Sequence, residues 1–232
     1  MRSTLDLLVW DIDGTLVDAN ATEEKAFLSA LRDPGGVTRV NCDWNAYENR
    51  TDTGVVYEIL KRHHGRAPTN VETSAVLSAY VANLEKAILR REYFAAVAVG
   101  ARDLLTSLRA AVFVMALSSG SIEESAVLKL RHARLESFFV AGAYSNDSYE
   151  RAKILQRSIQ KAEIAIGCQF PSLEVCFIGD QVWDARAAQS LGVRFVGITE
   201  NEDRAREMLR LGALRVFPGY QDANEILDTL SP

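Results

Sequence analysis

The sequence predicts an α/β protein with a doubly wound, mainly parallel sheet and an α-helical insertion after the first strand. Two observations carry this prediction. Short apolar segments alternate with longer amphipathic segments through the C-terminal two-thirds of the chain, which is the βαβα rhythm of a parallel sheet covered by helices. The first apolar segment is instead followed by a long stretch without another one, so we expect an insertion at that point.

The predicted strands are rich in Val, Ile, Leu and Phe and do not alternate strictly between apolar and polar residues. Continuous apolar runs of this kind are typical of strands that are buried on both faces of a parallel sheet. The candidates are Leu5–Trp10, Val112–Leu117, Phe138–Ala141, Val175–Ile178, Arg194–Ile198 and Leu214–Phe217.

Helical periodicity fills the segments between these strands. Stop signals support some of the boundaries, since Gly192 follows one predicted helix and Pro218-Gly219 follows the last predicted strand. The predicted helices of this part are Ala101–Leu108, Ile122–His132, Tyr149–Ala165, Trp183–Leu191, Asp203–Leu211 and Asp222–Leu230. Their alternation with the strands favours a Rossmann-like arrangement.

The segment between the first two predicted strands is helical in its patterning. Its predicted helices are Thr22–Leu31, Thr53–His64 and Val71–Tyr93. We therefore divide the chain into a Rossmann-like core, residues 1–17 and 96–232, and a helical cap, residues 18–95. The length of 232 residues agrees with this division, because it exceeds one average domain and falls short of two.

Composition and charge exclude several classes of protein. The 26 Lys and Arg residues face 31 Asp and Glu residues, and the resulting net charge of −5 argues against a nucleic acid partner. No apolar run approaches the roughly 18–20 residues that cross a bilayer. The N-terminal run from Leu7 to Trp10 is too short for a secretory signal. We therefore expect a cytoplasmic protein without a membrane or nucleic acid partner.

Polar residues follow four of the predicted strands, at the edge where open α/β sheets bind their ligands. In strand order they are Asp11 with Asp13, Ser118 with Ser119, Arg151, and Asp180 with Asp184. Singly, each has an ordinary interpretation, because Asp and Ser favour turns and helix N-caps. Together they supply a nucleophile, hydroxyl and amide donors, a cation and oxygen ligands for a metal, which are the requirements of phosphoryl transfer.

These residues stand in segments that resemble the motifs of the haloacid dehalogenase-like hydrolases. The four segments are Asp11-Ile12-Asp13-Gly14-Thr15, Ser118 after its apolar strand, Arg151, and Gly179-Asp180 with Trp183-Asp184. In the predicted cap, Arg50-Thr51-Asp52 is similar to a segment of phosphoglycolate-phosphatase-like members. The resemblance covers essentially the whole core.

The resemblance implies a phosphatase that works through an aspartyl-phosphate intermediate. Asp11 would attack phosphorus, and Asp13 would protonate the departing alcohol and then activate the hydrolytic water. Ser118 and the Ser119 amide would bind phosphoryl oxygens, and Arg151 would neutralise them from the other side. The substrate would be a small phosphorylated metabolite.

The resemblance also implies a magnesium ion, which suits a site built from oxygen ligands. Its ligands would be the Asp11 carboxylate, the Asp13 backbone carbonyl and Asp180, with Asp184 nearby. In the cap, the candidate substrate contacts are Glu23, Arg50 and Thr51.

Alternatives remain within and outside this family. Asp13 favours phosphate chemistry, because members that cleave carbon–halogen bonds lack the second acid. Glu23 stands where the phosphomutases commonly carry His, which weakens the phosphomutase alternative without eliminating it. A phospho-acceptor or binding protein is the non-enzymatic alternative. Lys153 is close enough in sequence to compete with Arg151 for the cationic role.

Overall fold

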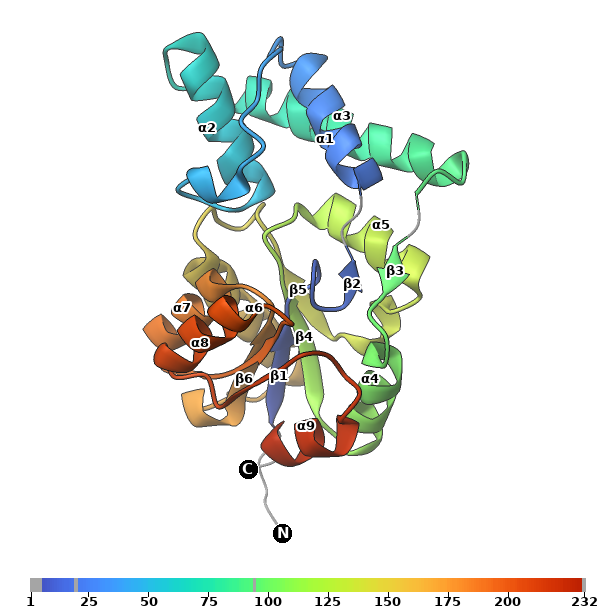
Figure 1. The fold of residues 1–232 in the computed structure, drawn as a ribbon, viewed down its shortest axis with the longest axis vertical. Coiled ribbons are helices and arrows are strands. Elements are labelled where there is room, and N and C mark those ends of the chain that lie inside the picture. Colours follow the sequence, from blue (N-terminus) through green and yellow to red (C-terminus); the bar gives the residue numbers. More distant parts are fainter. Residues whose placement is uncertain (1–5, 19–20, 94, 231–232) are drawn as a thin grey trace.

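The computed structural model describes residues 6–18, 21–93 and 95–230, and it confirms the predicted α/β architecture. Within these residues, six parallel strands form one sheet in the order β5-β4-β1-β6-β7-β8 (Figure 1). The strands are β1 (Leu7–Trp10), β4 (Val114–Ser118), β5 (Ala141–Ala143), β6 (Val175–Gly179), β7 (Arg194–Ile198) and β8 (Arg215–Phe217). Because β1 pairs with both β4 and β6, the ends of these three strands lie side by side.

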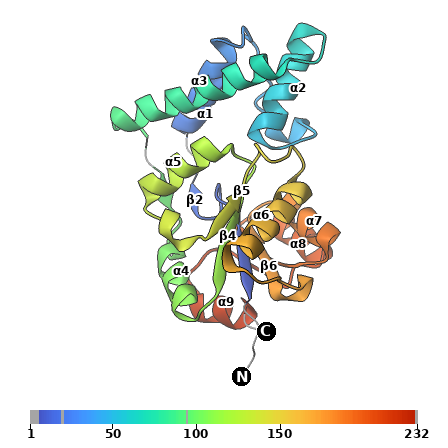
Figure 2. The ribbon, with the colours of Figure 1, turned by 180° about the vertical axis from the view of Figure 1, so that it is seen from behind.

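Helices cover both faces of the sheet (Figures 1 and 2), and β1 contributes to both cores. Leu8 and Trp10 pack with α4, α5 and α9, whereas Leu7 and Val9 pack with α6, α7 and α8. These helices are α4 (Ala101–Ala110), α5 (Glu123–Ala133), α6 (Arg151–Ile166), α7 (Val182–Leu191), α8 (Glu202–Arg210) and α9 (Ala223–Leu230). The four residues of β1 are fully buried, which explains its continuous apolar run.

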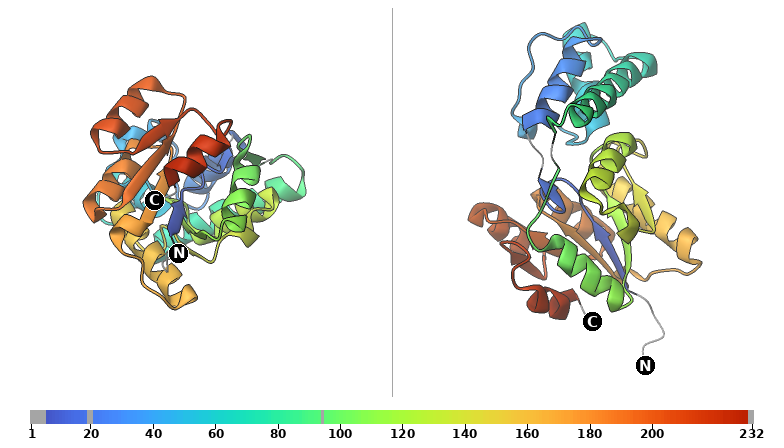
Figure 3. Two further views of the ribbon diagram at one scale, coloured as in Figure 1. Left: turned by 90° about the horizontal axis from the view of Figure 1, so that it is seen from below. Right: turned by 90° about the vertical axis from the view of Figure 1, so that its right-hand side faces the viewer.

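A helical layer lies above the carboxyl ends of the strands (Figures 1 and 3). Its elements are α1 (Ala21–Arg32), the 3₁₀ turn η1 (Trp44–Ala46), α2 (Asp52–His64) and α3 (Asn70–Leu89). They enclose a separate apolar cluster that includes Phe27, Val56 and Tyr80. The layer therefore has an apolar cluster of its own, which Ile122 at the start of α5 also joins.

Helix α3 ends earlier than the predicted Tyr93. Arg91 adopts a left-handed conformation with φ of 59°, and the amide of Glu92 donates to the carbonyl of Ala87 at 2.9 Å. This is the hydrogen bond that closes a helix around a left-handed C′ residue. The residue at that position is usually glycine, so the sequence carried no stop signal here.

The strand predicted at Phe138–Ala141 is shifted along the chain. Glu136–Phe138 forms the 3₁₀ turn η2, and β5 pairs residues Ala141–Ala143 with the end of β4. Phe138 is apolar because it packs into the core from this turn. A second 3₁₀ turn, η3 (Ser172–Glu174), precedes β6. The first predicted strand began at Leu5, which lies outside the described residues.

The chain also returns to β-structure earlier than predicted. Two short strands, β2 (Val17–Asp18) and β3 (Ala96–Val97), pair antiparallel where the chain leaves the sheet layer and re-enters it. Each is too short to give a periodic signal in the sequence. No helix among the described residues is long and apolar enough to cross a membrane.

Candidate active site

A cavity of about 820 Å³ lies between the carboxyl ends of the strands and the helical layer. Asp11, Asp13 and Asp180 line it from the sheet side. The helical layer contributes Glu23, Phe27, Trp44, Arg50, Thr51 and Tyr80. Of the residues that the sequence singled out, Asp11, Asp13, Ser119, Arg151 and Asp180 line this cavity, whereas Ser118 and Asp184 are buried beside it and do not line it.

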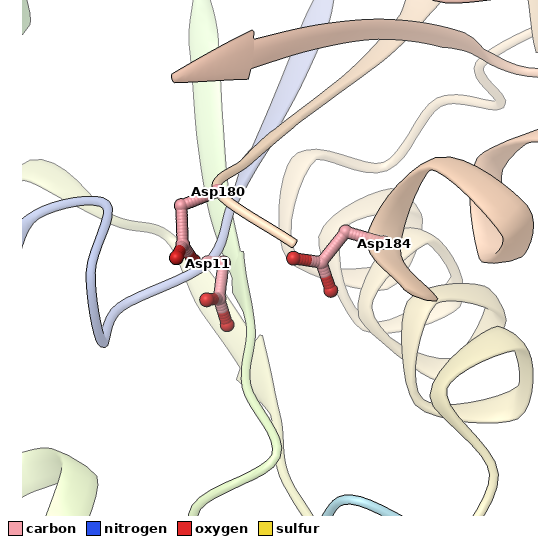
Figure 4. Close-up of side chains that lie close together, drawn as sticks. All are labelled: Asp11, Asp180 and Asp184. Carbon is pink, nitrogen blue, oxygen red and sulfur yellow. The ribbon is translucent and has the colours of Figure 1, made fainter. Parts of the chain in front are cut away.

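Three carboxylates form the floor of this site. Asp11 follows β1, Asp180 follows β6 and Asp184 lies in the first turn of α7, and each has a ligand oxygen within 4.8 Å of the others (Figure 4). All three are buried, at 4%, 5% and 0% exposure. Burial removes water that would otherwise stabilise the negative charges, and so the three groups repel one another strongly.

Burial, together with this repulsion, shifts the pKa values of two of the acids. Burial raises the pKa of Asp11 well above its usual range, Arg151 opposes the shift, and the carboxylates of Asp184 and Asp180 add to it. Burial together with Asp184 raises the pKa of Asp180 to about 7. A buried set of oxygen donors with unbalanced negative charge has the chemistry that a small divalent cation requires. The residues present therefore fit Mg²⁺.

Arg151, the first residue of α6, supplies part of the missing positive charge. Its Nη2 donates to Asp11 Oδ1 at 2.9 Å and to Asp184 Oδ1 at 2.5 Å, and its Nε donates to Asp184 Oδ1 at 3.1 Å. Burial lowers the pKa of Arg151, but Asp184 and Asp11 more than compensate and raise it above its usual value. Lys153 is 61% exposed and pairs with Glu150 at 2.6 Å, so of these two candidates it is Arg151 that contacts the carboxylates.

Asp184 is held by the start of its own helix as well as by Arg151. Its Oδ2 accepts from the amide of Gln181 at 3.2 Å, within a capping box at the start of α7. Both of its oxygens are thus engaged. The geometry makes Asp184 an anchor for Arg151 and for the loop after β6.

Asp180 has a cationic neighbour that the sequence analysis missed. Arg204 of α8 donates through Nη1 to the Asp180 carbonyl at 3.1 Å and to Asp180 Oδ2 at 3.3 Å. The hydroxyl of Thr15 lies 3.5 Å from Asp180 Oδ1. Nothing in the local pattern of α8 distinguishes Arg204 from the other arginines of this helix, because its partner is distant in sequence.

Gly14 permits the close approach of the first loop to Asp180. Its φ is +79°, and a Cβ at this position would lie 2.6 Å from Asp180 Oδ2. Both the backbone conformation and the available space therefore require glycine. The glycine of the first motif is explained by the packing of two strand-end loops against each other.

The loop after β4 corrects one expectation. Ser118 ends β4 and is 1% exposed, and Ser119 lines the cavity. The Ser119 amide, expected to bind phosphoryl oxygens, donates instead to the carbonyl of Ala143 at 3.1 Å. The β4–β5 ladder continues one residue beyond the strand and engages this donor. The Ser119 hydroxyl accepts from the Ser121 amide at 3.1 Å.

Asp13 lies beside a buried lysine that the sequence analysis also missed. Lys129 Nζ is 2.7 Å from Asp13 Oδ1 and 2.6 Å from Oδ2. A signal for Lys129 was present, because it falls on the apolar face of α5 at helical spacing from Ala126 and Ala133. A lysine on a buried face needs a partner.

The three candidate cap residues have different environments. Glu23 lines the cavity and pairs with Lys129 Nζ at 2.9 Å. The guanidinium of Arg50 lies 5.0 Å above the ring of Trp183, and both line the cavity. The Thr51 hydroxyl accepts from the Gly54 amide and donates to the carbonyl of Tyr149. It therefore caps α2 and docks it, and because Thr51 also lines the cavity its role as a substrate contact stays a prediction.

A parallel α/β sheet with a buried carboxylate cluster at its strand ends, beneath a helical layer, defines an α/β enzyme with an acidic active site. The chain belongs to the haloacid dehalogenase-like hydrolases, since the sequence model of this family matches residues 5–192. This membership confirms the resemblance found in the sequence. No curated protein matches the chain by sequence.

Solved structures share the fold over nearly the whole chain. A hydrolase from Pseudomonas syringae has a TM-score of 0.73 and 22% identity, covering 98% of this chain and 100% of its own. A form of CbbY from Rhodobacter sphaeroides in complex with xylulose-1,5-bisphosphate has a TM-score of 0.73 and 16% identity, and the match covers 94% of this chain and 96% of that one. A predicted phosphoglycolate phosphatase from Haemophilus somnus has a TM-score of 0.68 and 16% identity, and the match covers 97% of this chain and 100% of that one.

Proposed function

We propose that this protein is a Mg²⁺-dependent phosphatase that hydrolyses a small phosphorylated metabolite through an aspartyl-phosphate intermediate. The observation that carries the proposal is the position of Asp11, which lines the cavity, contacts Arg151 at 2.9 Å and lies beside Asp180 and Asp184. The similarity to a phosphatase and to a sugar-bisphosphate complex supports this class of substrate.

In the first step, an oxygen of Asp11 attacks phosphorus and the bond between phosphorus and the leaving oxygen breaks. Arg151 fixes one oxygen of Asp11 and reduces the repulsion between the carboxylate and the phosphate dianion. Asp11, Asp180 and the Asp13 carbonyl would hold Mg²⁺, with Asp184 behind them. When bound, the ion supplies the further positive charge that brings two anions together.

Asp13 transfers the protons of the reaction. It lines the same cavity as Asp11 and its side chain is 28% exposed, so it is open to the space that the substrate would occupy. Asp13 gives a proton to the leaving alcohol and then takes one from the water that attacks the aspartyl-phosphate. Inorganic phosphate and free Asp11 result. Proton transfer of this kind contributes about 10²- to 10⁴-fold to the rate.

The helical layer, residues 18–95, acts as a cap that closes over the bound metabolite and excludes water. Its contacts with the loops after β4 and β5 support this role. The Asp52 amide donates to the carbonyl of Gly120 at 2.8 Å, and the hydroxyls of Thr53 and Ser145 are 2.9 Å apart. Arg50 and Trp183 form a wall where these layers meet and would contact the leaving group.

The test is release of phosphate from p-nitrophenyl phosphate, measured with Mg²⁺ and with a chelator. We expect turnover to require Mg²⁺ and to be abolished in Asp11→Asn while the circular dichroism spectrum stays unchanged. Full activity of Asp11→Asn would overturn the nucleophile assignment. A panel of phosphorylated metabolites then identifies the substrate, and interconversion of isomers without release of phosphate would favour a phosphomutase.

A further inference from the structure

Lys129 is a fully buried cation that joins the sheet layer to the helical layer. Its Nζ contacts the two oxygens of Asp13 at 2.7 and 2.6 Å, Glu23 Oε1 at 2.9 Å and Ser121 Oγ at 2.9 Å. Its side chain has 0% exposure. These contacts come from the loop after β1, from α1 and from the loop after β4.

The surroundings of Lys129 keep it charged. Burial lowers its pKa, but the carboxylates of Asp13, Glu23 and Asp52 together raise it above its usual value. A buried ammonium must be hydrogen-bonded and paired, and the three contact residues meet this need. Lys129 is therefore a permanent cation at the junction of the two layers.

The contacts fix the orientation of Asp13. Asp13 lines the cavity, whereas Lys129 is fully buried and is not among the lining residues. Ser121, which also lines the cavity, donates a hydrogen bond from Oγ to Asp13 Oδ2 at 2.8 Å. Two donors thus hold the carboxylate. Lys129 therefore acts on a substrate through the side chains that it holds, Asp13 above all.

The same ammonium holds the helical layer in place. Glu23 belongs to α1, and the hydroxyl of Tyr80 from α3 donates to Glu23 Oε1 at 2.8 Å. Movement of α1 away from the sheet would therefore leave Lys129 without one of its two carboxylates. The Lys129 ammonium therefore holds both the helical layer, through Glu23, and the side chain of Asp13.

We propose that Lys129 is a positioning residue that orients Asp13 for proton transfer and links this orientation to closure of the cap through Glu23. The inference rests on the proposed function, since it takes Asp13 as the acid of the reaction. Its consequence depends on the leaving group. An alkoxide needs a proton in order to leave, whereas p-nitrophenolate departs readily without one.

The experiment compares Lys129→Met with wild type on glycerol 2-phosphate and on p-nitrophenyl phosphate, both with Mg²⁺. We expect kcat for the alkyl ester to fall about 10- to 100-fold, and kcat for the aryl ester to change by less than about 3-fold. Lys61→Met is the matched control, because Lys61 is an exposed lysine on α2. It should leave both rates unchanged. An equal loss on the two esters, or no loss, overturns the proposal.

Two further variants separate positioning from a purely structural role. In an Asp13→Asn background, Lys129→Met should cause no additional loss on the alkyl ester, because the two residues act as a unit. Independent, multiplying losses would contradict the proposal. Glu23→Gln keeps the contact between Lys129 and Asp13, so we expect KM to rise for both esters by the same factor while the ratio of the two kcat values is kept.

If Lys129→Met does not fold, Glu23→Gln still tests the proposed link between Lys129 and closure of the cap. An unchanged KM, or a rise confined to one ester, would overturn the link through Glu23. Failure of the proposed function gives a different result, since wild-type protein would then release phosphate from neither ester or Asp11→Asn would keep its activity.

Discussion

Arg151 donates from one guanidinium nitrogen to both Asp11 and Asp184, at 2.9 and 2.5 Å. Its Nε also donates to Asp184, so the rigid fork of donors on the guanidinium sets the geometry of both carboxylates, whereas an ammonium has no such fixed fork. Asp184 is fixed in turn by the start of α7. The orientation of the proposed nucleophile therefore depends on a chain of contacts that runs through Arg151 to the loop after β6.

The first prediction concerns this arginine. We expect Arg151→Met to lower kcat for p-nitrophenyl phosphate about 100-fold, because the nucleophile and the phosphate lose their nearest cation. Arg151→Lys should recover only part of this loss. Lys153→Met, on the exposed side of the same helix, is the control and should have wild-type kinetics. Equal effects at the two positions would contradict the assignment of Arg151.

The second prediction concerns pH and metal. The pKa of Asp180 in the folded, metal-free protein is about 7, above the value of an unfolded aspartate, and the pKa of Asp11 is raised as well. The folded state then binds more protons than the unfolded state between about pH 4 and 7. The contribution of these two groups to stability is therefore present at the low end of this window and is lost as the pH rises towards 7.

Thermal melts with and without Mg²⁺ measure this effect. Mg²⁺ relieves the repulsion of the ionised carboxylates, so it should raise Tm more at pH 8 than at pH 5. Asp180→Asn should reduce the difference. Burial also raises the pKa of Asp52 to about 7, which adds to the pH dependence, and this part should be insensitive to Mg²⁺. An equal Tm shift at both pH values would speak against a metal at the three aspartates.

The third prediction concerns Gly14. Gly14→Ala meets two obstacles, a φ of +79° and a Cβ position 2.6 Å from Asp180 Oδ2. Gly65→Ala is a matched control, since Gly65 has a φ of +68° and no atom within 4 Å of the added Cβ. We expect Gly65→Ala to cost about 1 kcal/mol of unfolding free energy from the backbone alone. Gly14→Ala should cost more.

The two glycine variants should also differ in their response to metal. Displacement of Asp180 in Gly14→Ala should raise the Mg²⁺ concentration needed for half-maximal activity, whereas Gly65→Ala should leave it unchanged. Urea denaturation and Mg²⁺ titration of phosphate release measure the two effects. Equal values for the two variants in both measurements would show that the contact with Asp180 has no consequence.

Much of the core could be predicted because its signals are local. The strand at Arg194–Ile198 has the predicted bounds, and Gly192 ends α7 in a left-handed conformation, as its position indicated. The predicted boundaries were wrong where an apolar run had a cause other than a strand, or where a helix ended without a glycine or proline. Phe138 is apolar in a 3₁₀ turn, and α3 ends at a left-handed arginine, Arg91.

The sequence by itself determined the fold class, the helical layer after β1, and the strand-end aspartates Asp11, Asp13 and Asp180. These follow from periodicity and from the rule that parallel strands end at one edge of a sheet. Tertiary structure decided the choice of Arg151 over Lys153 and the pairing of Lys129 with Asp13. The reason is physical: a buried charge is retained only beside its partner, and Lys129 and Asp13 are 116 positions apart in the chain.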